Sequence, residues 1–167
     1  MAVENTKSSV ITDLDKTPPK AVEALLMGGR LREAVATAAV AAADDDTSTY
    51  RFVRVHSSWR LAAILLLNDA ITGGTSFDVG LYETAENGGA AKDADLFATA
   101  VDLSSARVDP LDVLHEALDI NKGQQRIWEM LGESVDPNRF YDLVLTANTV
   151  GTAAGDITVK VRYVDGS

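Results

Sequence analysis

The segment Ile157-Thr158-Val159-Lys160-Val161-Arg162-Tyr163-Val164 alternates apolar and polar side chains along its length. Because successive side chains of a β-strand point to opposite faces, this alternation predicts a strand with one buried face. The inward face carries Ile157, Val159, Val161 and Tyr163. The outward face carries Thr158, Lys160 and Arg162. Such a strand is typical of an antiparallel sheet with one side on a hydrophobic core.

The same period of two recurs towards the N-terminus. We expect further strands in the runs that begin near Tyr141, Leu96, Phe77, Tyr50 and Arg30. In one of these runs, strict alternation puts Tyr50, Phe52 and, less cleanly, Arg54 on one face, with Arg51, Val53 and Val55 on the other. The run from Trp59 to Ile71 is apolar at almost every position. It predicts a strand that is covered on both sides or that carries a bulge.

Polar and glycine-rich segments separate these strands. Gly73–Gly74 predicts a hairpin between two strands, and Glu86-Asn87-Gly88-Gly89 predicts a turn. Asp44-Asp45-Asp46 is interpreted as a solvated turn. A calcium loop is the alternative, but the spaced ligands and the glycine of such a loop are missing.

Two segments have helical rather than strand spacing. Asp109-Pro110, followed by Leu111, Leu114, Ala117 and Leu118, has an N-cap residue and a proline at the first helical position. Gln124 to Leu131 suits a short helix that ends at Gly132 and buries Ile127, Trp128 and Leu131.

Seven or eight strands with regular turns predict a mainly β protein. We expect an antiparallel β-sandwich of Greek-key or jelly-roll type over residues 30–167, with one or two short helices. Residues 1–29 differ in composition, and the pair Pro18–Pro19 excludes helix at Thr17. Residues 21–27 suit one or two helical turns that end at Gly28–Gly29. We expect an extended N-terminal arm that either remains disordered or becomes ordered against another subunit.

The chain has 167 residues, no cysteine and a formal net charge of −10. Residues 1–60 carry no net charge, residues 61–121 carry −9 and residues 122–167 carry −1. Nucleic acids and anionic membranes require a basic face, so we expect neither as a partner. The longest apolar run is far shorter than a membrane span, and no secretion signal is recognisable. The acidic middle predicts a surface that faces solvent.

No phosphate-binding loop, zinc motif or nucleophile motif is present. His56 precedes Ser57 and Ser58, but strand neighbours point to opposite faces, which predicts that they do not pair. Two histidines without cysteine make a zinc site improbable. Trp59 and Trp128 are interpreted as core residues. We therefore expect no enzymatic activity, no catalytic residue, no cofactor and no metal.

The sequence resembles small virion structural proteins of tailed bacteriophages. The residues that carry the resemblance are Met1 to Ser9, Gly29 to Glu33, Tyr50-Arg51, Arg54-Val55, Asp78 to Tyr82, Gly88 to Ala90 and Lys160 to Val164. It covers most of the chain, and none of its motifs is a chemical signature. The functional class that it indicates is the head decoration, or cement, protein. The β-sandwich that the resemblance implies would make Asp109–Leu118 strand or loop, in conflict with the helical spacing, and both alternatives stay open.

The resemblance implies a non-enzymatic protein that binds the outer surface of a mature phage head and bridges major capsid subunits. The partners would be the major capsid protein and further copies of this chain, as a dimer or trimer, assembled in the host cytoplasm. The candidate interface residues on and beside the arm are Lys7, Lys16, Lys20, Arg30 and Arg32. One alternative is a tail, baseplate or fibre module that binds a host glycan through exposed aromatics in a groove. A small hydrolase with two close carboxylates is a further alternative.

Overall fold

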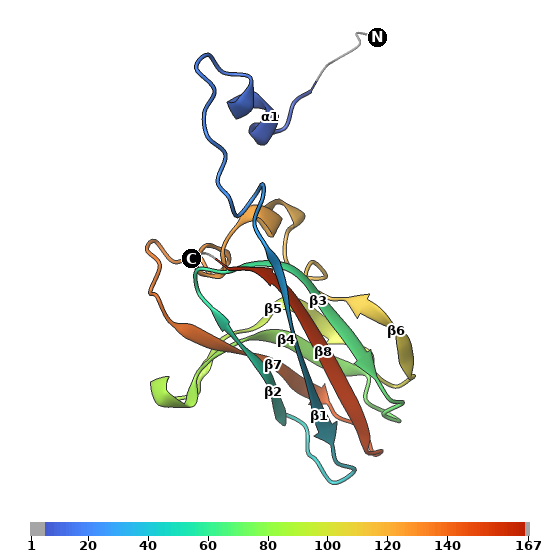
Figure 1. The fold of residues 1–167 in the computed structure, drawn as a ribbon. Helices are drawn as coiled ribbons and strands as arrows, with labels where there is room; N and C mark the ends of the chain where they lie inside the picture. The colour runs from blue at the N-terminus through green and yellow to red at the C-terminus, as the bar shows by residue number, and fades with distance from the viewer. Residues whose placement is uncertain (1–5, 166–167) are drawn as a thin grey trace.

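A computed structural model describes residues 6–165 and shows two packed antiparallel sheets (Figure 1). The eight strands are β1 (Leu31–Val40), β2 (Thr49–His56), β3 (Arg60–Asn68), β4 (Ser76–Glu83), β5 (Ala91–Val101), β6 (Arg107–Asp112), β7 (Phe140–Thr149) and β8 (Gly155–Val164). The helices are α1 (Ser9–Leu14) and α2 (Ile127–Met130), with the 3₁₀ turns η1 (Ala85–Asn87) and η2 (Ile120–Gln124). The predicted mainly β sandwich is confirmed.

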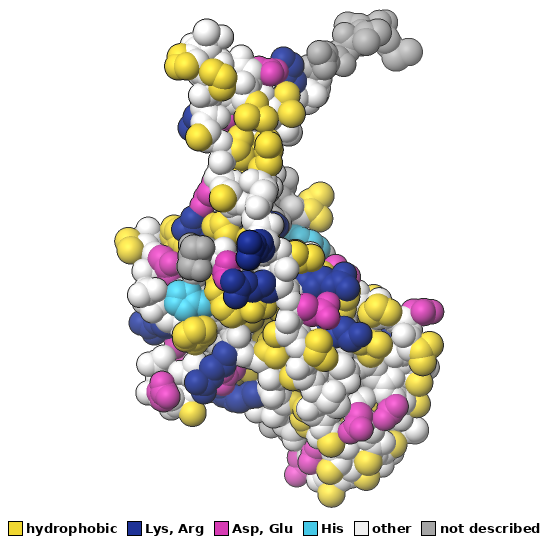
Figure 2. All heavy atoms as spheres, in the orientation of Figure 1, with side chains coloured by type: hydrophobic (Ala, Val, Ile, Leu, Met, Phe, Trp, Pro, Cys, Tyr) yellow, Lys and Arg dark blue, Asp and Glu magenta, His cyan; other side chains and the backbone are white. Residues whose placement is uncertain are grey.

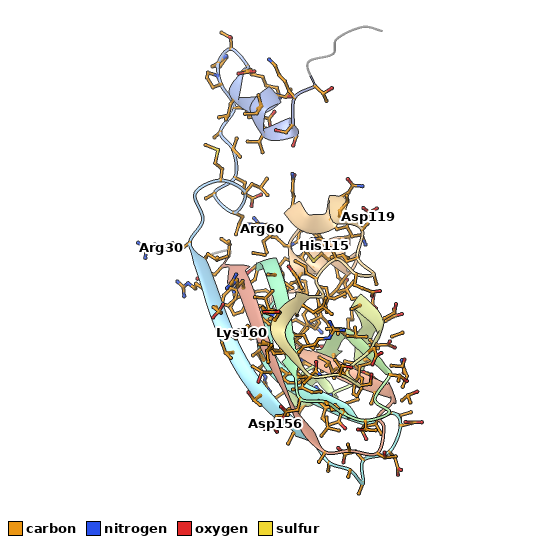
Figure 3. All side chains as sticks on the ribbon, turned by 90° about the vertical axis from the view of Figure 1, so that its right-hand side faces the viewer. Arg30, Arg60, His115, Asp119, Asp156 and Lys160 are labelled. Carbon is orange, nitrogen blue, oxygen red and sulfur yellow. The ribbon has the colours of Figure 1, made fainter. Side chains whose placement is uncertain are left out.

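The strands enter the sheets in an interleaved order. One sheet has the order β1-β8-β3-β6 and the other β2-β7-β4-β5. The chain therefore changes sheet at every connection except the one between β4 and β5. Figure 3 shows the two sheets edge-on as two layers.

Between the layers lies one hydrophobic core. Its largest fully buried side chains include Tyr141, Phe77 and Phe97. The strand β8 places Ile157, Val159 and Val161 in this core, each fully buried, as its alternation predicts. Tyr163 also packs against the core and remains half-buried.

The hairpin predicted at Gly73–Gly74 is wrong. This turn joins β3 to β4, which lie in different sheets. The place beside β3 is taken by β8 and the place beside β4 by β7, both from the C-terminal part of the chain. These long-range pairings decide the connection, and the glycines turn the chain from one layer to the other.

The helix predicted from Asp109 is also wrong. Residues 107–112 form β6, an edge strand in which Leu111 lies opposite Leu66. A proline is tolerated on an edge strand because its missing N–H leaves no ladder bond unmade there. The chain then turns, and the Asp112 carboxylate accepts a bond from the Leu114 amide at 3.1 Å.

The second predicted helix is partly confirmed. Helix α2 covers Ile127–Met130, and η2 occupies part of the segment before it. Ile127 is buried as expected, together with Met130, whereas Trp128 and Leu131 are only half-buried.

A bulge in β2 changes the predicted faces of that strand. The register shifts between Arg51 and Val53, so the alternation slips by one residue. Tyr50 and Val55 consequently both point into the core. Arg51 and Arg54 share the outer face, where both pair with Asp142 at 2.9 and 3.0 Å.

The arm contains one short helix that the sequence pattern did not indicate. Ser8 caps α1 by accepting a bond from the Ile11 amide. Residues 24–28 form a single turn in which the Met27 amide bonds the Glu23 carbonyl, and Gly28 ends it at φ 98°. The first five residues of the predicted arm lie outside the described residues.

Candidate interaction surface at the arm end

The arm projects from one end of the sandwich as a stalk (Figure 1). Leu25 is the one buried residue within the described part of the arm, at 7% exposure. Its carbonyl accepts a bond from Arg60 Nε at 2.8 Å, and Glu23 pairs with Arg126. These contacts attach the root of the arm to the body, while α1 stands clear of the body (Figure 1).

The three candidate lysines of the arm are paired within the arm itself. Lys7 pairs with Asp15 at 2.7 Å, and Lys16 and Lys20 both approach Asp13, at 2.5 and 3.4 Å. The hydrogen bond from Lys16 is the largest influence that lowers the pKa of Asp13. Exposed pairs of this kind contribute little stability and exchange readily. In these contacts three lysines share two carboxylates, so one positive charge remains in excess.

The two candidate arginines lie at the arm root. Arg32 pairs with Asp165 at 2.9 Å. Within residues 6–165, Arg30 has no ion-pair partner. It points away from the body beside β1 (Figure 3). Of the five candidate cations, Arg30 is therefore the one whose charge is most available to a partner.

An open groove of roughly 440 Å³ lies at this root. Arg30, Arg32 and Arg126 line it, against the acids Glu23 and Asp165. Basic side chains thus predominate here, although the chain as a whole carries −10. Figure 2 shows basic side chains gathered where the arm meets the body.

A second groove, of roughly 450 Å³, opens at the same end of the sandwich. Its aromatic wall includes Phe140, which is 47% exposed, and Trp59, whose ring lies edge-on to Phe140 at 6.3 Å. Trp59 also stacks on Tyr163 at 4.0 Å between ring centroids. The other lining residues are His56, Ser58, Arg126, Asp136 and Asn138.

Trp59 is thus core-packed on one side and borders a groove on the other. The sequence interpretation places Trp59 in the core and does not identify Phe140 or Arg126 as candidate site residues. The available signal was their position, since Trp59 directly precedes β3 and Phe140 begins β7.

The expectation that His56 does not pair with the following serines is wrong for Ser58. His56 Nδ1 lies 2.8 Å from Ser58 Oγ and accepts a bond from the Ser58 amide at 3.2 Å. The reason is that β2 ends at His56, so strand alternation does not extend into the turn. Ser57 is fully buried and donates to Asp136 Oδ1 at 2.5 Å.

These contacts shape the turn after β2. Burial raises the pKa of Asp136, but the Ser57 hydroxyl and the Asn138 amide together hold it below the usual value. Asp136 Oδ1 therefore anchors both Ser57 and the Asn138 amide, the latter at 2.8 Å. The arrangement is that of a hydrogen-bonded loop anchor.

Two acids on β5 satisfy one expectation of the hydrolase alternative. Burial and the neighbouring Asp95 carboxyl raise the pKa of Asp93. This pair is distant in sequence from the arm end, and Asp95 is exposed.

Across residues 6–165, no three metal-ligating side chains gather closely enough to hold an ion. No helix of that part is long and apolar enough to cross a membrane.

No protein-family model matches the sequence, and no curated protein matches it. A chain in the capsid of Ralstonia phage GP4 is similar in structure, with a TM-score of 0.61 at 11% identity over 83% of this chain and 86% of that chain. A chain of the cyanophage Pam1 capsid asymmetric unit matches at a TM-score of 0.45, 13% identity and 83% and 86% coverage. A chain of the acidic stable capsid of Helicobacter pylori bacteriophage KHP30 matches at 0.41, 14% identity and 83% and 95% coverage. Of these three, the similarity to the GP4 chain indicates a shared fold.

Proposed function

We propose that this protein is a structural component of a phage head. The observation that carries the proposal is the fold shared with a chain of the Ralstonia phage GP4 capsid. The strand order supports the same conclusion, because an eight-stranded double sheet with interleaved strands fits the jelly-roll architecture of many viral capsid domains. The resemblance of the sequence to virion structural proteins is an independent argument.

Within that class, we propose a decoration or cement role on the outer surface of the head. A non-enzymatic protein of this kind needs a rigid body and a contact that spans neighbouring capsid subunits. The sandwich supplies the body, and the arm with its root supplies a contact surface. Many weak contacts over a shell reinforce it through multivalency.

The arm end is the surface that we assign to the capsid. Ile11 and Met27 are 46% and 56% exposed, and among residues 6–29 only Leu25 is buried. Apolar side chains on a projecting segment gain free energy when a partner covers them. At the root, Arg30 offers an unpaired charge to acidic groups of the capsid, and the lysines can exchange their local partners for capsid acids.

The direct test mixes purified protein with expanded, undecorated phage heads and images them. We expect additional density at regular positions on the shell. Deleting residues 1–22 removes α1 but keeps Leu25 and its bond from Arg60, and this variant should fold and fail to decorate. Deleting residues 1–29 should do the same with a small loss of stability.

Two outcomes would overturn the proposal at different levels. Absence of density with the full-length protein contradicts the decoration role. Full occupancy by a folded variant without residues 1–22 contradicts the role of the arm. The variant Arg30→Glu at the root is expected to weaken decoration most at low salt, because the attraction is screened as salt rises.

The aromatic groove supports a second candidate function, the binding of a host-surface glycan by a tail or fibre module. Phe140 and Trp59 supply apolar ring surface, and Asp136, Asn138 and Arg126 supply polar groups beside it. Binding of purified protein to host cells, combined with no binding to heads, would favour this candidate.

A further inference from the structure

The outer face of the sheet β1-β8-β3-β6 carries an apolar stripe along β3 that no other segment of residues 6–165 covers. The run from Leu61 to Leu67 is apolar at every position, so both faces of β3 are apolar. Leu61, Ile64 and Leu66 fill the core at 0–1% exposure. Ala62, Leu65 and Leu67 remain on the outside, with Ala62 exposed and the two leucines half-buried.

An outer sheet face that meets water normally carries polar side chains. The sheet β2-β7-β4-β5 follows that rule, with Arg51, Arg54 and Asp142 outside. The sheet β1-β8-β3-β6 departs from it along β3 and at two further positions, because Val35 on β1 is 54% exposed and Val108 on β6 is 86% exposed. The outer positions of β8 between β1 and β3 are the polar Thr158, Lys160 and Arg162. Figure 2 faces this sheet and shows hydrophobic side chains beside a small group of charged ones.

The strand register places a positive and a negative side chain on the two sides of β3. Leu65 lies opposite Lys160 on β8 and opposite Asp112 on β6, so one row reads Val35, Lys160, Leu65, Asp112. Figure 3 labels Lys160 on β8. Neither charge forms an ion pair with another side chain in the part of the chain that the structure describes.

We propose that this face is the interface of a two-fold dimer of the chain, with the axis along β3. Such an axis lays Leu65 on Leu65 of the second copy and Leu67 on Leu67. It also brings Lys160 opposite Asp112 of the second copy, and this pair forms twice. An in-plane axis at right angles to the strands would instead set β8 against β8 and Lys160 against Lys160.

The area is sufficient for a weak, specific dimer. Four strands spaced by about 4.8 Å and eight residues of about 3.3 Å each give a face of roughly 500 Å² per copy. The total of about 1,000 Å² lies at the lower limit of specific interfaces. Two sheets packed face to face in this way keep their strands within about 30° of each other. The proposal does not depend on capsid binding.

The test measures the molar mass of the full-length protein by sedimentation between about 5 and 200 µM. We expect a monomer–dimer equilibrium. Leu65→Asp should abolish the dimer and leave the circular dichroism spectrum unchanged. Thr49→Asp, on the exposed outer side of β2 in the other sheet, is the matched control and should dimerise normally.

A double-mutant cycle tests the axis. Asp112→Asn removes the charge and keeps the oxygen that accepts the amide bonds of Ile64 and Leu114. Lys160→Gln and Asp112→Asn should each weaken the dimer about fivefold, and the double variant no further than either alone.

Three results would overturn the proposal. A monomer at every concentration, or a trimer, excludes the dimer. A dimer that survives Leu65→Asp in folded protein places the interface elsewhere. Additive effects of Lys160→Gln and Asp112→Asn exclude the axis along β3. None of these results depends on whether the protein decorates heads.

Discussion

Tyr50 and Asp44 show how single side chains hold the loop between β1 and β2. The Tyr50 hydroxyl donates to the Asp44 carboxylate at 2.8 Å, and the same oxygen accepts a bond from the Ala41 amide at 2.9 Å. Asp46 accepts a bond from the Val150 amide at 3.0 Å. The acidic turn is therefore an anchor between loops, in which two of the three carboxylates accept backbone amides.

This contact makes the stability of the folded state depend on pH in the alkaline range. Burial, and then the Asp44 carboxylate, raises the pKa of Tyr50 from 10.0 to about 12. The folded state therefore holds this proton more tightly than the unfolded state, so the stabilisation is complete below pH 10 and is lost as pH rises towards 12. We expect the urea unfolding midpoint to fall above pH 10.

The matched variant is Tyr50→Phe. It should lose about 1 kcal/mol of unfolding free energy at pH 7, since one hydrogen bond is removed, and its midpoint should depend less on pH above 10. An equal alkaline decline in both proteins would show that other groups cause it.

At the element scale, β5 crosses β4 in an irregular register. Leu81 lies opposite Asp93 and Val79 opposite Ala98, so five residues of β5 span two residues of β4. The bulge passes directly over Gly80. A Cβ atom there would overlap the backbone carbonyl oxygen of Asp93 and the backbone of Ala94. Glycine at position 80 is thus required by a close approach of backbone to backbone.

Gly80→Ala should therefore destabilise the sandwich by at least about 2 kcal/mol, because backbone cannot move aside as a flexible side chain can. Gly132→Ala is the control. It has open space around its Cβ but a φ of 74°, so about 1 kcal/mol is expected. Chemical denaturation measures both variants, and equal losses would show that β5 adapts to the added methyl group.

At the scale of the whole molecule, the acidic charge lies on the surface. The eleven acids of residues 61–121 are all exposed or half-buried, against two basic residues in the same segment. The interpretation that the acidic middle faces solvent agrees with their exposure. Basic side chains also gather at the arm root, where Arg30, Arg32 and Arg126 line one groove.

This distribution predicts a salt effect on stability. Repulsion among like charges destabilises the compact state, and salt screens it. We expect the thermal midpoint to rise by a few degrees when NaCl increases from about 20 to about 200 mM at pH 7. Near the isoelectric point of ≈4.5 the effect should vanish. A midpoint at pH 7 that is insensitive to salt would contradict the argument.

Much of the fold was predictable because the sequence pattern of a strand depends only on neighbouring residues. The alternation from Ile157 to Val164 depends on neighbouring residues alone, and it identifies both the strand and its buried face. The candidate site was less accessible to such reasoning. The five arm cations were found by composition, but only coordinates show that Lys7, Lys16 and Lys20 are paired locally whereas Arg30 is free of such a pair within the described residues.

The sequence by itself determined the secondary-structure class, the different composition of residues 1–29 and the concentration of acidic residues in the middle of the chain, since each depends on local composition and period. Only the tertiary structure decided which strands pair. Contacts between residues about 100 positions apart place β8 beside β3. As a result, Gly73–Gly74 connects two different sheets, and a segment with helical spacing forms the strand β6. Pairing over such distances depends on burial shared by the whole core, which no local window of residues contains.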